Sequence, residues 1–128
     1  MRILLDTVAL WWIASSDPQL SRPAMEIFVD RANEVAVSPV SLWEIIVKHQ
    51  LGKLTLDRPI EEVLDELRRE RTIRTLPVHE SAVYRVRLLP NIHRDPFDRL
   101  LICQAQDEEM TILTPDAAIQ QYPVKTIW

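Results

Sequence analysis

Four carboxylates from distant parts of the chain are the residues with the most chemical potential. Each stands beside an apolar segment or a helix-start signature, and they are Asp6, Glu44, Asp98 and Asp116. Clusters of carboxylate oxygens bind hard cations such as Mg²⁺ or Mn²⁺, which polarise phosphoryl oxygens and activate water. If the fold brings the four acids together, they predict metal-dependent hydrolysis of a phosphodiester.

One of these acids lies in the densest charged stretch of the chain, residues 93–101. Asp95 directly before Pro96 is typical of a helix start, with aspartate as N-cap and proline at the first helical position. Asp98 then falls in the first turn, where a carboxylate also suits the positive end of the helix dipole. Both acids therefore have a structural interpretation beside the metal-binding one.

Glu44 is more telling than the other acids. Ser38 before Pro39 predicts a helix start, so Glu44 lies too deep in the helix to be a capping residue. The helical period places it on a predicted core-facing side, which also carries Val40, Val47 and Leu51. A carboxylate on such a face is costly unless it is paired or bound to a metal, which favours a ligand role.

The elements that must position these acids alternate between strand and helix. Short apolar segments predict strands at residues 2–5, 34–38, 72–77, 110–114 and 124–127. Helical periodicity and caps predict helices over 8–14, 21–32, 38–51, 59–67, 79–89 and 95–108, with a short one from Pro115. Gly52, the single glycine, follows the third of these helices, where a C-terminal cap favours glycine.

This alternation predicts an α/β fold in which a short central parallel sheet has helices on both faces. In open parallel sheets, functional sites gather outside the carboxyl ends of the strands. Asp6 and Asp116 fall at such strand ends, although each could also serve a helix start.

Composition sets further bounds. A chain of 128 residues with 47% hydrophobic residues predicts one globular domain. The net charge of −4 argues against an overall positive field for nucleic acid, but two bound divalent cations would cancel it. The longest apolar run, Val8 to Ala14, is too short to span a bilayer, and the single Cys103 excludes an intramolecular disulfide. We expect a cytoplasmic protein with no membrane association.

Six segments in chain order carry a resemblance to a known family. They are Leu4-Leu5-Asp6-Thr7-x-Ala9-Leu10-x-Trp12, Ser38-x-x-Ser41-x-Trp43-Glu44-Ile45 with Lys48, Gly52-Lys53-Leu54, Leu89-Pro90 before His93, Asp95-Pro96-Phe97-Asp98-Arg99-Leu100-Leu101-Ile102-x-Gln104-Ala105, and Leu113-Thr114-x-Asp116. Together these segments resemble PIN-domain toxins of the VapC type, over residues 3–116.

The resemblance implies a three-layer α/β/α PIN fold over residues 1–128 and Mg²⁺- or Mn²⁺-dependent endoribonuclease activity. It also implies a homodimeric toxin that acts on RNA and is silenced by a small cognate antitoxin. By position, the catalytic and metal-binding set is Asp6, Glu44, Asp98 and Asp116. Asp95 would then be the helix cap and an outer-shell acid, and Thr114 a hydroxyl residue beside the site.

The sequence departs from the family pattern at Val8, where many relatives have histidine after the Asp–Thr pair. This difference bears on local substrate contacts rather than on the four acids. Basic residues near the motifs could contact RNA phosphates, namely Lys48, Lys53, Arg94 and Arg99. Alternatively, Arg94 and Arg99 pair with neighbouring acids.

Other residues have a plainer interpretation. The basic group Arg68, Arg69, Arg71 and Arg74 is typical of a solvated face. Trp11 and Trp12 could stack bases, but we expect them to pack in the core or at a dimer interface. His79 and His93 are expected to be loop or cap residues, because a hard-cation site does not require imidazole.

Two other functional classes compete with the ribonuclease. A phosphatase with Asp6 as nucleophile would need a second acid two residues later, where Val8 stands, and a phospho-acceptor receiver domain would need paired acids near the first strand. A non-enzymatic alternative is a protein of PIN fold that contacts RNA or a protein partner without cutting.

Overall fold

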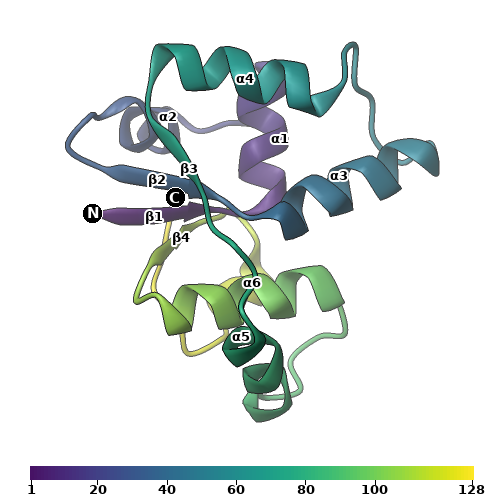
Figure 1. Ribbon diagram of the computed structural model, residues 1–128, viewed down its shortest axis with the longest axis vertical. Coiled ribbons are helices and arrows are strands. Elements are labelled where there is room, and N and C mark those ends of the chain that lie inside the picture. The colour runs from purple at the N-terminus through teal and green to yellow at the C-terminus, as the bar shows by residue number, and fades with distance from the viewer.

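Five short strands form one parallel sheet in the order β3-β2-β1-β4-β5, as Figure 1 shows in part for the computed structural model, which describes residues 1–128. The strands are β1 (Arg2–Leu5), β2 (Glu34–Val37), β3 (Ile73–Thr75), β4 (Thr111–Leu113) and β5 (Thr126–Ile127). Every neighbouring pair is parallel. The predicted parallel sheet is therefore confirmed.

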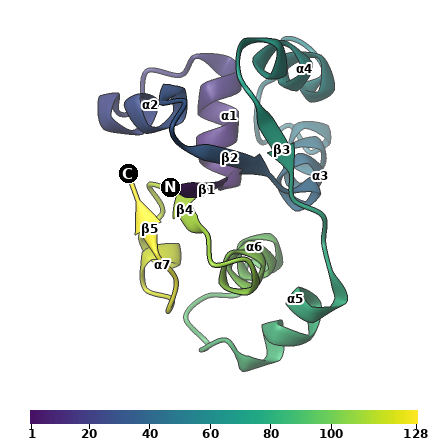
Figure 2. The same ribbon diagram turned by 60° about the vertical axis from the view of Figure 1, so that its left-hand side comes forward.

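Helices cover both faces of this sheet. They are α1 (Thr7–Ser15), α2 (Arg22–Val29), α3 (Pro39–Gln50), α4 (Ile60–Glu70), α5 (Glu80–Arg85), α6 (Pro96–Asp107) and α7 (Ala117–Gln120), with a 3₁₀ turn η1 (Val86–Leu88). In Figure 1 the helices α1, α2 and α4 lie above the sheet and α5 and α6 below it, and Figure 2 shows α7 beside β5. No helix has the length and apolar character needed to cross a membrane.

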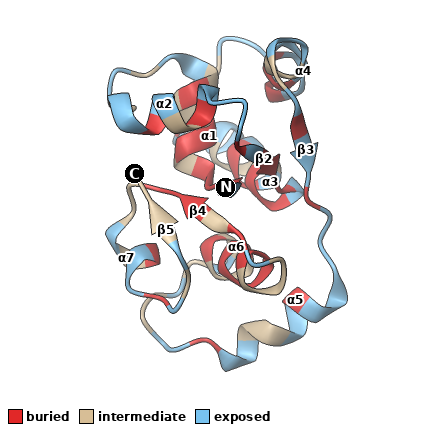
Figure 3. Ribbon diagram, turned by 90° about the vertical axis from the view of Figure 1, so that its left-hand side faces the viewer, coloured by how far each residue is buried: buried red, intermediate tan, exposed pale blue.

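Two hydrophobic cores, one on each face, result from the strand alternation. On β1, Ile3 and Leu5 pack in the core under α1, α2 and α4, while Leu4 packs in the core with α6. On β4, Leu113 packs in the same core as Ile3 and Leu5, and Ile112 packs in the same core as Leu4. Figure 3 shows the buried residues of these helices on the sides that face the sheet. The predicted three-layer α/β/α arrangement is confirmed.

Side-chain caps begin the helices as predicted. Ser21, Ser38 and Asp95 are the N-caps of α2, α3 and α6, and each accepts a hydrogen bond from the first turn. Gly52, just past α3, has the positive φ of 70° that favours glycine.

Several predicted elements are shorter in the structure, and two of them have a clear local cause. Helix α2 ends at Val29 rather than near Ala32, because the Asp30 carboxylate accepts a hydrogen bond from the Ala32 N–H at 2.9 Å and forms a turn. Strand β3 covers three residues of the predicted six. The Leu76 N–H still donates to the Val37 carbonyl, but Pro77 has no N–H to continue the ladder.

Gln104 ties α6 to the carboxyl ends of two strands. Its side chain is buried, and its Oε1 accepts a hydrogen bond from Ser38 Oγ at 2.6 Å. Its Nε2 donates to the carbonyls of Leu76 and Pro77 at 3.3 and 3.2 Å. One amide therefore holds the helix that carries Asp98 against the sheet.

We expect Gln104→Leu to lower the free energy of unfolding by about 1–3 kcal/mol, because it leaves the buried Ser38 hydroxyl and the strand-end carbonyls without their partner. Urea unfolding measures the change. Gln106→Leu on the same helix is the matched control, because Gln106 makes a single exposed hydrogen bond, to Pro123. Equal losses in both variants would contradict the assigned role.

Candidate metal centre at the strand ends

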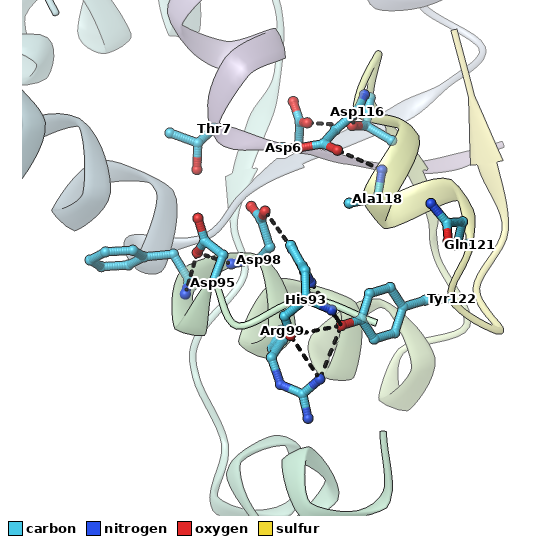
Figure 4. A network of polar contacts seen from close by, with 12 residues as sticks. Asp6, Thr7, His93, Asp95, Asp98, Arg99, Asp116, Ala118, Gln121 and Tyr122 are labelled. Carbon is cyan, nitrogen blue, oxygen red and sulfur yellow. Dashed lines mark hydrogen bonds and ion pairs between the residues drawn. The ribbon is translucent and has the colours of Figure 1, made fainter. Parts of the chain in front are cut away.

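The site lies where the strand order changes direction. From β1 the sheet continues through β2 and β3 on one side and through β4 and β5 on the other. The carboxyl ends of β1 and β4 therefore flank a switch point, where open parallel sheets form a crevice. Asp6 follows β1 directly, and Asp116 follows β4 after two residues. Figure 4 shows their side chains facing those of α6 across this end of the sheet.

The local fold fixes Asp6 in one orientation. Asp6 is buried and is the N-cap of α1, where its Oδ1 accepts the Ala9 N–H at 2.6 Å. Its Oδ2 accepts a hydrogen bond from the hydroxyl of Thr114, which in turn accepts the Asp116 N–H at 3.0 Å. Thr114 is thus hydrogen-bonded to Asp6, and its supporting role at the site stays a prediction.

Glu44 is held by partners from two helices. Its side chain is 2% exposed, and its Oε1 accepts a hydrogen bond from Thr7 Oγ1 of α1 at 2.6 Å. Its Oε2 forms an ion pair with Lys48, one turn later on α3. Burial works against the charge of Lys48, but the bond and charge of Glu44 outweigh it and raise the Lys48 pKa.

The predicted core-facing side of α3 is only partly correct. Val40 is buried as expected, whereas Leu51 is 63% exposed. The reason is the length of α3, whose last turns extend beyond the sheet in Figure 1. Glu44 is therefore buried because it lies in the first half of the helix.

Asp95 and Asp98 take different roles at the start of α6. Asp95 is the N-cap, and its Oδ1 accepts the N–H groups of Phe97 and Asp98 at 2.9 and 3.1 Å. Asp98 is 8% exposed, and its Oδ2 contacts His93 Nε2 at 3.0 Å. The cap predicted for Asp95 is confirmed.

Three carboxylates come close enough to share one cation. Glu44, Asp95 and Asp98 each place an oxygen within 4.8 Å of the others. This all-oxygen set fits a hard divalent cation, which takes few carboxylates and keeps several waters. Asp6 and Asp116 lie outside this triplet, yet close enough for their charges to act on Asp98 or on each other. The structure thus groups Asp95 with Glu44 and Asp98, and its outer-shell role stays a prediction.

The electrostatics of the site favour a bound cation. Burial, reinforced by the charges of Asp98 and Asp116, raises the pKa of Asp6 to about 7, although hydrogen bonds from Thr114 and Ala9 oppose this. Burial also raises the pKa of Asp98 to about 6, against the bond from His93 and with the charges of Asp95, Glu44 and Asp116. A cation between the carboxylates would remove this penalty on their charged forms.

The sequence reasoning missed the part that His93 plays. It lies in the loop before α6, as expected, and its ring also bridges Asp98 and Tyr122, with Nδ1 at 2.7 Å from the Tyr122 hydroxyl. If Nε2 donates to Asp98, Nδ1 accepts the Tyr122 proton. Figure 4 shows the chain from Asp98 through His93 to Tyr122 and Arg99. The spacing of His93 to Asp98 is visible in the sequence, whereas Tyr122 lies too far along the chain to be identified.

Among the basic residues near the motifs, Lys48 pairs with an acid of the site, whereas Arg94 and Arg99 do not. Arg99 donates to the Pro90 carbonyl at 2.9 Å and to the Tyr122 hydroxyl at 3.0 Å, so it holds the loop before α6. Arg94 is exposed and forms no ion pair with Asp95 or Asp98. Phosphate contacts by Lys48, Arg94 and Arg99 stay predictions.

Comparison with known proteins identifies the family to which this fold belongs. The PIN domain family model matches residues 3–125 of the chain. Ribonuclease VapC22 from Mycobacterium tuberculosis is 29% identical over 132 residues, which cover 98% of this chain and 98% of that protein.

Solved structures show the same fold. VapBC2 from Rickettsia felis, bound to a DNA fragment from its promoter, superposes with a TM-score of 0.72 at 16% identity and covers 99% of this chain and 98% of that one. DNA-bound VapBC from Salmonella typhimurium gives 0.69 at 13% identity, with 99% and 97% covered.

Raised aspartate pKa values predict that the cation-free protein loses stability as pH rises. At pH values between its unfolded pKa near 3.8 and its folded pKa, each acid binds more protons in the folded state than in the unfolded state. The free energy of unfolding therefore falls as the pH rises, through about pH 6 for Asp98 and about pH 7 for Asp6. The upper limit is about 3–4 kcal/mol per group. Urea unfolding from pH 5 to 8 measures it. We expect Asp6→Asn to flatten the slope, and an unchanged slope would contradict this assignment.

We expect His93→Ala to weaken divalent-cation binding about tenfold or more, because Asp98 loses the N–H group that orients it. Calorimetry with Mn²⁺ gives the affinity. His93→Gln, which can still donate to Asp98, should recover part of the loss. The control is His79→Ala, since His79 is exposed. The role of His93 would be refuted by equal affinities for His93→Ala and the wild-type chain.

Proposed function

The chain belongs to the PIN-domain family, and from this premise we propose that it is a metal-dependent endoribonuclease, the toxin of a toxin–antitoxin pair. It hydrolyses RNA phosphodiester bonds with Mg²⁺ or Mn²⁺. The similarity to Ribonuclease VapC22 along nearly the whole chain supports the assignment to this class.

The observation that carries the proposal is the convergence of buried acids at the switch point. Glu44, Asp95 and Asp98 offer oxygens to a common cation, and Asp6 faces them from the end of β1. A buried acid cluster without a cation destabilises the fold, so its presence favours a functional role. When bound, a divalent cation would polarise a phosphoryl oxygen and acidify water.

The chain's own residues prepare the site for such a cation. Asp6, Glu44, Asp98 and Asp116 are the proposed catalytic ligands, and Asp95 joins them at the triplet or supports it from outside. The hydroxyls of Thr7 and Thr114 and the imidazole of His93 fix three of these carboxylates by hydrogen bonds. Fixed ligands lose little freedom when the cation and the RNA bind, which is how preorganised polar sites gain catalytic power.

Lys48 is the proposed contact for an RNA phosphate nearest to the acids. It is paired with Glu44 and half-exposed, so its ammonium can remain on the carboxylate while it faces solvent. A phosphate approaching the cation would meet this positive charge beside Glu44. Arg94, which is exposed in the loop before α6, offers a second such contact.

Exposed apolar side chains supply surface for the protein partners that we propose, a small antitoxin and a second copy of the chain. Trp43 is 60% exposed beside Glu44 and packs edge-on against Phe97 at 4.8 Å between ring centroids. Tyr84 and Leu88 are 58% and 73% exposed at α5 and η1. The two solved structures compared above are of DNA-bound VapBC, and their likeness in fold supports the antitoxin partner that we propose here.

We expect the purified chain, free of antitoxin, to cut RNA with Mg²⁺ or Mn²⁺. Asp6→Asn and Asp98→Asn should each reduce the rate by about two orders of magnitude or more, because each removes a ligand charge while it keeps the size of the side chain. Gel-resolved cleavage of total cellular RNA measures the rate. Asp65→Asn on the exposed side of α4 is the matched control.

The same assay separates the enzyme from the non-enzymatic alternative. A wild-type chain that binds RNA but leaves it intact with both metals would show that the protein is a binding module. Cleavage that persists in Asp6→Asn would place the activity outside the proposed acid cluster.

A further inference from the structure

Five of the chain's arginines line one hollow at the end of the sheet opposite the acids. The hollow has a volume of about 460 Å³ and lies where the end of α4 meets the starts of β2 and β3. We name it the arginine basin, and its arginines are Arg31, Arg68, Arg69, Arg71 and Arg74. Figure 1 shows this end of the sheet, with the last turn of α4 and the amino end of β2 on the same side.

The basin is electrostatically unsatisfied. None of its arginines forms an ion pair, although the chain has 19 acidic against 15 basic residues and pairs four other arginines with carboxylates. Two acids, Glu34 and Glu70, lie among the lining residues, and Glu34 already pairs with Arg2. The lining therefore has five positive and two negative charges, a net of +3 in a chain of −4.

Two of the arginines are fixed by the fold. Arg71 donates from Nη2 to the Asn33 carbonyl at 2.9 Å and lies 5.2 Å from the ring centre of Phe28. Its Nη1 is buried without a hydrogen-bond partner. Arg68 donates to the Thr75 hydroxyl at 2.8 Å. The fold therefore holds the Arg71 guanidinium in place while one of its nitrogens, Nη1, has no hydrogen-bond acceptor.

The other three arginines have few or no partners within the chain. Arg69 and Arg74 are exposed and have no hydrogen-bond or ion-pair partner, and Arg31 makes one long contact of 3.4 Å to the Glu70 carbonyl. Burial lowers the pKa of Arg71, and repulsion from the charge of Arg31 adds to this effect while the charge of Asp30 opposes it. An anion would relieve this repulsion.

The composition of the lining favours phosphate as the anion. Planar guanidinium groups bind phosphate oxygens in a bidentate manner. One of the ten lining residues is hydrophobic, whereas the centre of a protein–protein interface is enriched in apolar and aromatic side chains. The basin therefore fits the backbone of a nucleic acid better than it fits a protein partner.

We propose that the arginine basin binds backbone phosphates of the RNA substrate, away from the bond that is cut. The inference rests on the proposed ribonuclease function and extends it. Strand β2, which has four residues and is roughly 13 Å long, begins in the basin lining and ends toward the acid site. An RNA must therefore be long enough, or folded, to engage both ends, so the basin selects extended substrates over very short ones.

The test compares two double variants that remove the same charge. Arg69→Gln with Arg74→Gln removes two positive charges from the arginine basin without breaking a contact in the fold. Arg87→Gln with Lys125→Gln is the matched control, because both side chains are exposed, have no hydrogen-bond or ion-pair partner and lie outside the basin lining. Each pair is measured with a labelled single-stranded RNA and with a trinucleotide, and urea unfolding confirms equal stability.

Binding is measured by fluorescence anisotropy in an Asp98→Asn background, so that the RNA stays intact. We expect the basin variant to bind the long RNA about 10- to 30-fold more weakly at 0.1 M salt. The slope of log affinity against log salt should become shallower by about 1.4, the value for two lost phosphate contacts. In the cleaving chain, KM for long RNA should rise while kcat and trinucleotide cleavage stay unchanged.

Several results would contradict the proposal that the arginine basin binds RNA. These are equal RNA binding by the two double variants, an equal loss of trinucleotide cleavage, or weakened antitoxin binding with RNA binding unchanged. The proposed function fails in a different way, since a wild-type chain that never cuts RNA but binds it through the basin would overturn the enzyme and leave the basin standing.

Discussion

Mutual repulsion among buried carboxylates is the constraint on which this structure depends. Acids from four segments of the chain meet in a crevice where water screens their charges poorly. The fold provides a hydrogen-bond donor for each of three of them, from Thr7, Thr114 and His93, and Lys48 pairs with Glu44. These donors hold the oxygens in place but leave most of the negative charge uncompensated, which is what a site made for a cation requires.

The sheet makes this convergence possible. Because all five strands are parallel, every strand ends at the same edge, and the reversal of order beside β1 opens the crevice there. Two separate cores, one on each face, keep the short strands from sliding. Gln104 adds a polar tie between α6 and the strand ends, so that the helix with Asp98 cannot shift without breaking hydrogen bonds.

Local signals in the sequence predicted much of this arrangement. A serine or aspartate before proline marked the starts of α3 and α6, and strand-end positions singled out Asp6 and Asp116. Those features depend on neighbours in the chain. The likeness to the PIN family, confirmed over residues 3–125, added the order of the motifs.

Contacts between distant segments could not be predicted. The pairing of His93 with Tyr122, and the position of Asp95 among the triplet, depend on how loops pack in three dimensions. Four arginines of the basin were interpreted from the sequence as a solvated face. The sequence shows a basic run, but the hollow and the unpartnered Nη1 of Arg71 exist only because the end of α4 meets the start of β2.

Three of the site acids also cap helices, and this double duty shapes how the protein can evolve. Asp6, Asp95 and Asp116 begin α1, α6 and α7, so their loss would damage the fold together with the chemistry. Asparagine is the exception, since it caps a helix as well as aspartate and carries no charge. A lineage could therefore abandon catalysis by single-nucleotide changes and keep an intact scaffold, free to be recruited as a silent relative that still engages the old partners.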